Sequence, residues 1–332
     1  MQLNLNKLLT IAPFFLWGTA MVAMKGTLDH TTPLFMAVMR LLPAGLLILA
    51  ATVIFRLPQP KTLKAWLWIG LFALVDGTMF QGFLAEGLAR TGAGLGSVLI
   101  DSQPLAVALL CCWLFGEAIG WVGWLGLSLG ILGISAIGLP EDWIFSLFQG
   151  AETTVSFNIE NILQSGELLM LLASLSMAVG TVIIRPLGRH ADPVVATGWH
   201  MILGSLPLCM GSGIWEEQQW VQITGSDWLA LAYSTVFGTA IAYGIFFYLA
   251  NRENLTSLSA LTFLTPVFAL LFSYLLLSEQ LSLLQWCGVS LSLVAIYLIN
   301  QRERIACWWE SLVAGNFTVF STKMLFSLEK EN

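Results

Sequence analysis

The stretch "LTPVFALLFSYLLLSEQLSLLQWCGVSLSLVAIYLI", residues 264–299, has a counterpart earlier in the chain, "SQPLAVALLCCWLFGEAIGWVGWLGLSLGILGISAI", residues 102–137. The two stretches superpose, without a gap, when Pro104 is placed on Pro266; this alignment is here called the main register. Between residues 97 and 129 ten pairs then match: Ser97/Ser259, Leu99/Leu261, Pro104/Pro266, Leu109/Leu271, Leu114/Leu276, Glu117/Glu279, Trp124/Trp286, Gly126/Gly288, Ser128/Ser290 and Leu129/Leu291. Leucine matches are expected by chance in so apolar a chain, but the proline, glutamate, tryptophan and glycine matches are not. The sequence therefore contains an internal repeat.

The composition indicates a membrane protein. Hydrophobic residues make up 57% of the 332 residues and charged residues only 10%, whereas a typical soluble domain is about 25% charged. A soluble fold of this length could not hide so much apolar surface from water. The net charge of -6 argues against a nucleic-acid partner, which calls for a basic face.

Ten apolar runs are long enough to cross a bilayer, which takes about 20 residues. They are residues 8–25, 34–55, 65–86, 94–115, 119–139, 167–185, 194–214, 228–250, 255–277 and 281–300. Inside lipid each segment must satisfy its own backbone amides, so the runs are predicted to be helices.

The repeat predicts the topology. Each copy, residues 8–139 and residues 167–300, holds five helices, so the second copy must enter the membrane from the opposite side. The predicted fold is an all-α integral membrane protein of ten transmembrane helices in two inverted five-helix repeats. An acidic loop, 140–166, joins them and a tail, 301–332, follows. Such duplication is typical of secondary transporters, although it could also serve only to build a stable bundle.

The basic residues predict the orientation. With the N-terminus inside, eleven of the fourteen fall on the cytoplasmic side: Lys7, Arg56, Lys61, Lys64, Arg185, Arg189, Arg252, Arg302, Arg304, Lys323 and Lys330. This bias follows the positive-inside rule. We therefore expect a multi-pass protein of the cell (inner) membrane with both termini cytoplasmic and the acidic loop outside.

Ionisable residues inside the spans are the first functional candidates, because placing each one in the bilayer costs about 2.5–3.5 kcal/mol of insertion free energy unless it is paired or hydrated. Four of them are Arg40, Asp76, Asp101 and His200. Arg40 falls on His200 in a slightly shorter register of the repeat, the one that also places Lys25 on Arg185. Arg40 could attract a carboxylate or phosphate, or pair with Asp76 or Asp101. His200 could take up a proton or remain a neutral core residue.

Other side chains complete the predicted substrate cavity. They are Trp17, Gln81, Gln103 and Tyr243. Aromatic residues also form interfacial belts, which is the alternative for Trp17 and Tyr243. Mid-span prolines kink helices and free carbonyls that can line a cavity, or they mark packing bends. Pro104 and Pro266 are the predicted kinks.

The sequence indicates no cofactor, metal or catalytic site. It has no Walker A motif, and its five cysteines show no Cys/His spacing of a metal site. A membrane enzyme usually clusters its catalytic groups, yet the three histidines are scattered and Asp76 and Asp101 lie on different spans.

The sequence resembles the drug/metabolite transporter superfamily, EamA type. The resemblance rests on Trp17-Gly18, on Arg40, and on the Pro104-to-Glu117 unit followed by Gly126, repeated as Pro266 to Glu279 followed by Gly288. It implies ten helices, cytoplasmic termini, a central cavity, and transport, often export, of amino acids or other small metabolites.

The predicted function is therefore that of a secondary transporter, not an enzyme, which exports small metabolites such as amino acids. Its partners are the small-molecule substrate and the lipid bilayer; the oligomeric state stays open. The alternatives are a polytopic membrane enzyme that acts on a lipid-linked substrate and a non-transporting membrane scaffold.

Overall fold

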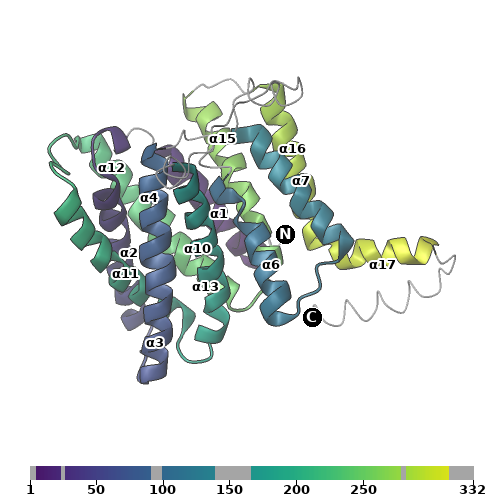
Figure 1. Ribbon diagram of the computed structural model, residues 1–332, viewed down its shortest axis with the longest axis horizontal. Helices are drawn as coiled ribbons and strands as arrows, with labels where there is room; N and C mark the ends of the chain where they lie inside the picture. The colour runs from purple at the N-terminus through teal and green to yellow at the C-terminus, as the bar shows by residue number, and fades with distance from the viewer. Residues whose placement is uncertain (1–4, 24–26, 91–98, 139–165, 278–281, 314–332) are drawn as a thin grey trace.

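The computed structural model describes residues 5–23, 27–90, 99–138, 166–277 and 282–313, and within these ranges its regular elements are all helices (Figure 1). They are α1 (Leu5–Ala23), η1 (Thr27–Asp29), α2 (Pro33–Ile54), α3 (Leu63–Phe72), η2 (Ala73–Phe80), α4 (Gln81–Arg90), α6 (Gln103–Phe115), α7 (Gly120–Gly138), α10 (Gly166–Leu187), α11 (Pro193–Trp215), α12 (Gly225–Tyr233), η3 (Ser234–Ile241), α13 (Ala242–Ala250), α14 (Leu255–Ala260), η4 (Leu261–Phe263), α15 (Leu264–Leu277), α16 (Leu283–Asn300) and α17 (Arg302–Val313).

Several of these helices can span a membrane. In the described ranges, eight are long and apolar enough by length and composition, and two shorter apolar helices cover Leu8–Ala20 and Leu99–Phe115. This confirms the prediction of an all-helical membrane protein. Residues 140–165 of the predicted acidic loop, Glu279 and the tail beyond residue 313 lie outside the described residues.

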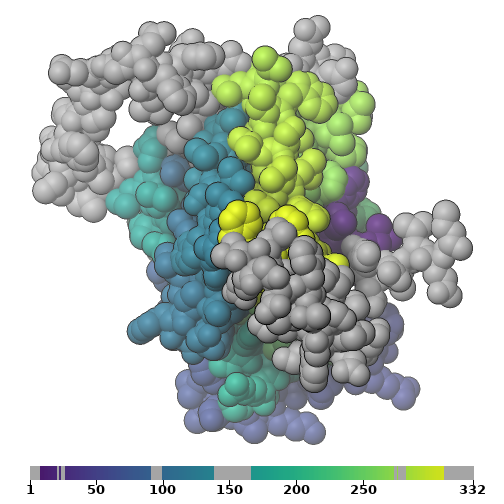
Figure 2. Space-filling model, turned by 90° about the vertical axis from the view of Figure 1, so that its right-hand side faces the viewer, coloured from purple at the N-terminus to yellow at the C-terminus, as the bar shows by residue number. Residues whose placement is uncertain are grey.

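Helices that are equivalent in the sequence repeat pack against each other. The most extensive helix pairs are α2 with α11 and α7 with α16. Small residues allow the α7–α16 contact: a Cβ atom on Gly133 would lie 2.9 Å from the carbonyl oxygen of Gly288. Figure 2 shows α7 and α16 side by side along one face of the molecule.

The first helix of each predicted half lies among the helices of the other half. Helix α1 packs against α15 and against η3 and α13, whereas α10 packs against α6 and against η2 and α4. Each first helix thus makes its most extensive contacts with the other half of the chain.

Two spans contain a π-helical segment, and the two segments lie one residue out of step in the main register of the repeat. η2 interrupts the span Leu63–Arg90 and η3 interrupts the span Gly225–Ala250. Each segment carries a Gly-Thr pair, and Gly77-Thr78 has the same place within η2 as Gly238-Thr239 has within η3. π-Helical turns are rare and often lie at functional sites, since they redirect side chains within a helix.

The two predicted kink prolines each follow a break in a span. Ser102 forms a turn before α6, and the 3₁₀ segment η4 precedes α15. Pro104 and Pro266 lie in the first turn of the helix that comes next, beside the break that a missing backbone N–H favours.

The buried apolar residues form two main cores. The larger one includes residues of α1, α2, α10, α11 and α13. The smaller one consists of Ala108, Ile119, Leu127, Ile134, Ala260, Phe263, Ala295 and Ile299, and so lies between α6, α7, α16 and the α14–η4 segment. Helix α17 leaves the end of α16 sideways (Figure 1), and Trp309 on it packs against Trp121 with ring centroids 5.9 Å apart.

The contact between η2 and α11 gives a stability prediction. A Cβ atom at Gly204 would lie 2.5 Å from Gly77 Cα and 2.8 Å from the Ala73 carbonyl oxygen. We expect Gly204→Ala to lower the free energy of unfolding by about 1–3 kcal/mol because the core is overpacked. Thermal unfolding in detergent measures it. Gly213→Ala in the same helix is the control, because its Cβ meets nothing within 4 Å; equal stability of the two variants would contradict the prediction.

Candidate functional site

The centre of the candidate site is an acid–base pair on two helices. Oδ2 of Asp76, on η2, lies 3.2 Å from Nε2 of His200, on α11, and both side chains are buried. The imidazole lies against the Phe72 ring at a centroid distance of 4.0 Å and against Phe247 at 5.7 Å. An apolar cage therefore surrounds the pair, which strengthens the attraction between its members.

A glycine makes room for the Asp76 carboxylate. A Cβ atom at Gly180, on α10, would lie 2.5 Å from Asp76 Oδ1. Thr181, the next residue, accepts a hydrogen bond from Gln103 Nε2 at 3.1 Å. The Gly180-Thr181 step thus places α10 against the carboxylate on one side and against α6 on the other.

Tyr243 joins the other polar candidates. Its hydroxyl accepts a hydrogen bond from Gln81 Nε2 at 3.2 Å, and its ring lies 5.0 Å from the Trp17 ring. Gln81 and Tyr243 are equivalent positions in the main register of the repeat. The Tyr243 ring also lies 5.9 Å from the Phe247 ring, which contacts the His200 imidazole, so aromatic contacts connect Tyr243 with the buried pair.

The ion pairing differs from the alternatives that the sequence offered. Among the residues that the structure describes, Arg40 forms no ion pair with Asp76 or Asp101, and the partner of Asp76 is His200. Asp101 is partly exposed and lies two residues ahead of Gln103 in the chain.

The candidate residues hold unused hydrogen-bonding capacity. Within the described ranges, buried atoms of the candidate residues without a hydrogen-bond partner are Trp17 Nε1, Arg40 Nε, both carboxylate oxygens of Asp76, Gln103 Oε1 and His200 Nδ1. A buried polar atom without a partner costs about 1–3 kcal/mol. A polar ligand would satisfy these atoms, although Arg185, Thr256, Thr265, Ser292 and Arg302 outside the site also hold such atoms.

Sequence reasoning did not select Gly180, Thr181, Phe72 or Phe247 for the site. The first two carried a signal, because Gly18-Thr19 and Gly180-Thr181 match in the main register. The two phenylalanines carried none, since aromatic residues are common along the chain.

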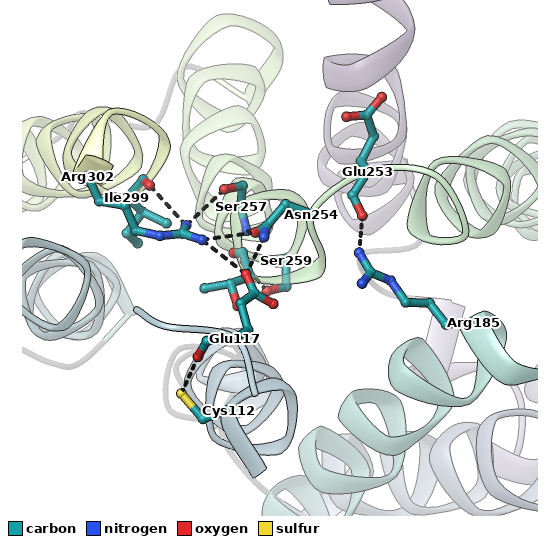
Figure 3. A network of polar contacts seen from close by, with 10 residues as sticks. Cys112, Glu117, Arg185, Glu253, Asn254, Ser257, Ser259, Ile299 and Arg302 are labelled. Carbon is teal, nitrogen blue, oxygen red and sulfur yellow. Dashed lines mark hydrogen bonds and ion pairs between the residues drawn. The ribbon is translucent and has the colours of Figure 1, made fainter. Parts of the chain in front are cut away.

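A second polar cluster, here called the Arg302 network, lies at the end of the bundle where α17 begins (Figure 3). Arg302 Nη2 lies 3.0 Å from Glu117 Oε1, and Arg302 Nη1 donates to Ser257 Oγ at 3.0 Å. Asn254, the N-cap of α14, donates to Glu117 Oε1 and accepts from Arg302 Nη2. Arg302 is only 6% exposed. The network ties together the α6–α7 turn, the start of α14 and the start of α17.

Two further contacts lie at the same end. Cys112 Sγ donates to the Glu117 carbonyl oxygen at 3.0 Å, and Arg185 donates to the Glu253 carbonyl oxygen (Figure 3). Arg185 also lies 5.5 Å from the centre of the Phe115 ring. The ends of α6, α10 and α13 are thus fastened close to the Arg302 network.

The model of the EamA-like transporter family matches residues 6–139 and again residues 164–301. The chain belongs to this family. An uncharacterized transporter of Synechocystis sp. is 63% identical to it over 295 residues, 89% of each chain. A probable amino-acid metabolite efflux pump of Salmonella typhimurium is 26% identical over 290 residues, 85% of this chain and 90% of that protein.

A solved structure shares the fold of this EamA-like chain. The TM-score is 0.72 at 18% sequence identity, and the likeness covers 90% of this chain and 97% of the other. The family and its named members indicate a membrane transporter.

The buried pair in this EamA-like protein gives a second prediction. His200→Phe should strongly destabilise the fold, by about 3–5 kcal/mol, because it leaves the Asp76 carboxylate buried without its partner. Adding Asp76→Asn removes that charge and should restore part of the loss. Thermal unfolding in detergent compares the two variants. A double variant no more stable than His200→Phe alone would contradict the pairing.

Proposed function

We propose that this protein is a secondary transporter of the cell (inner) membrane that exports small zwitterionic metabolites, with amino acids as the leading class. One observation carries the proposal: the Asp76–His200 pair is buried inside an apolar bundle, and Trp17, Arg40 and His200 keep buried polar atoms without partners. A fold that only had to be stable would replace such a cluster by apolar side chains.

We propose that ten spanning helices form two inverted halves, residues 8–139 and 167–300, with both termini in the cytoplasm. The double match of the family model supports the duplication. Two further observations support it. Helix α1 packs mainly among helices of the second half and α10 among helices of the first half, and a π-helical segment interrupts one span of each half. The equivalent residues Gln81 and Tyr243 form a hydrogen bond with each other. Equivalent residues can meet only near the axis that relates the two halves, so this contact supports such an axis.

The charges of the site fit a zwitterion. The Arg40 guanidinium is suited to a carboxylate, since it offers several donors in one plane. The Asp76 carboxylate is suited to an ammonium group, with His200 as its partner when no substrate is present. The rings of Trp17 and Tyr243 offer apolar contact to the rest of a small metabolite.

Transport requires that the site opens to one side at a time. In the proposed orientation, the Arg302 network lies at the cytoplasmic end and holds that end closed. In the main register of the repeat, Asn254 corresponds to Gly92 and Arg302 to Pro140. Neither glycine nor proline can form such an ion pair, so these positions cannot supply an equivalent network at the opposite end. The network therefore favours the state that is closed toward the cytoplasm.

Arg40 provides the test of the substrate site. Proteoliposomes that contain the protein and a mixture of radiolabelled amino acids should show protein-dependent efflux. We expect Arg40→Gln to slow this efflux at least about tenfold, because a charge-assisted contact with the substrate carboxylate is lost. Arg189→Gln, which removes an exposed arginine after α10, is the matched control and should transport like the wild type.

Two outcomes of this experiment would count against the proposal. If the wild-type protein shows no measurable efflux of any amino acid, amino acids are excluded as its substrates. Equal rates for Arg40→Gln and Arg189→Gln would remove Arg40 from the site. Repeating the assay with and without a pH gradient decides whether export is coupled to protons.

The Arg302 network gives a further prediction about gating. We expect Arg302→Gln to speed maleimide labelling of Cys112 about tenfold, since the charged contacts that hold the α6–α7 turn are worth about 1.5–3 kcal/mol. The assay uses a variant in which Cys111, Cys209, Cys287 and Cys307 are replaced. Arg304→Gln is the control, because Arg304 is exposed and bonds only to Gln301 among the described residues. Equal labelling rates for the two variants would show that the network is not a gate.

A further inference from the structure

An apolar groove lies on the surface of the bundle, away from the polar cluster. It has a volume of about 600 Å³ and is lined by residues of α1, α2, α11, η3 and α13, among them Leu9, Leu47, Ala51, Ile241 and Gly244. Leu9, Leu47 and Ile241 are exposed. None of the predicted substrate-site residues lines it. Among the described lining residues, Tyr248 has the one polar side chain, so the walls offer no charged partner to a zwitterion.

The groove begins at one end of the bundle and runs toward the middle. Leu9 lies in the first turns of α1, Ala51 near the end of α2 and Val194 at the start of α11. Because these helices alternate in direction, all three positions belong to the same end. Val236 and Ile241, from the middle of the span Gly225–Ala250, line the deeper part.

A positive charge lies at the mouth of the groove. Tyr248 forms part of the lining, and the exposed Arg252 stacks on its ring at 4.3 Å from the guanidinium carbon to the ring centroid. An apolar channel with a cation at its end matches one membrane component in shape and charge, which is an acyl chain with a phosphate headgroup above it.

We infer that the groove binds one acyl chain of an anionic phospholipid of the cytoplasmic leaflet, with Arg252 at the headgroup phosphate. The choice of leaflet rests on the orientation proposed above; the binding itself does not depend on transport. Each methylene group that enters the groove exchanges contacts with neighbouring lipid for contacts with a fixed protein wall, so the acyl chain gains packing contacts. The Arg252 guanidinium adds selectivity for anionic headgroups.

The test uses purified protein in detergent, with dioleoyl phosphatidylglycerol or dioleoyl phosphatidylcholine added. Native mass spectrometry counts retained lipids, and thermal unfolding measures stabilisation. For the wild type we expect a retained phosphatidylglycerol and a rise in Tm of about 5 °C over the phosphatidylcholine sample. Gly244→Leu should abolish both effects, because a side chain at this position enters the groove without a clash: its Cβ meets nothing within 4 Å.

Two matched variants separate the acyl-chain contact from the charge contact. Gly70→Leu, on α3 outside the groove, also has an open Cβ position and should bind lipid like the wild type. Arg252→Gln should keep a bound lipid but lose the preference for phosphatidylglycerol. Undiminished phosphatidylglycerol binding by Gly244→Leu would overturn the inference. So would a wild-type dimer that Gly244→Leu converts to monomers, because the occupant of the groove would then be a second copy of the chain.

Discussion

A charged group inside a bilayer has to find its partner within the protein, and the Asp76–His200 pair meets this constraint through the packing of three spans. The carboxylate comes from the π-helical segment η2, the imidazole from α11, and Gly180 of α10 leaves the space that the carboxylate fills. The close approach of Gly77 and Gly204 sets the distance between η2 and α11. If either glycine carried a larger side chain, the two helices would separate and the pair would lose its geometry. The small residues of these spans are therefore as much a part of the site as its charges.

In the proposed inverted-repeat architecture, two states are nearly equal in free energy, and the departures from the repeat decide between them. A protein of two similar halves can close toward either side at similar cost. The Arg302 network adds charged contacts that its repeat counterpart cannot match, since the corresponding sequence positions hold Gly92 and Pro140. A few kcal/mol of such contacts shift a two-state equilibrium by one to two orders of magnitude. In the proposed transport cycle, substrate binding then has to stabilise the other state by a comparable amount, so that opening depends on the substrate.

Much of the fold could be predicted from the sequence, because the apolar runs and the repeat are properties of the chain itself. The starts of α2 and α11, at Pro33 and Pro193, correspond in the same register that pairs Arg40 with His200. The partner of Asp76 could not be predicted, since it depends on which helices touch. Nor could the π-helical segments, because no local propensity marks them. The sequence places Arg302 only among the basic residues of the cytoplasmic side, although the side chain is buried against Glu117 and Asn254.

The two apolar cores indicate which parts move when the transporter opens. The small core includes residues of α7 and α16, whereas α6 and α14 contribute to both cores. The spans that contain α6 and α14 are also the ones broken ahead of a proline, at Ser102 and at η4. A close-packed core resists deformation and moves as a unit, so the freedom to move concentrates at these breaks. We therefore expect α7 and α16 to swing as one body about the two breaks. The Arg302 network connects α7 and α16 to α14, which lies on the other side of the break at η4. Contacts at this place would resist the expected rotation of α7 and α16.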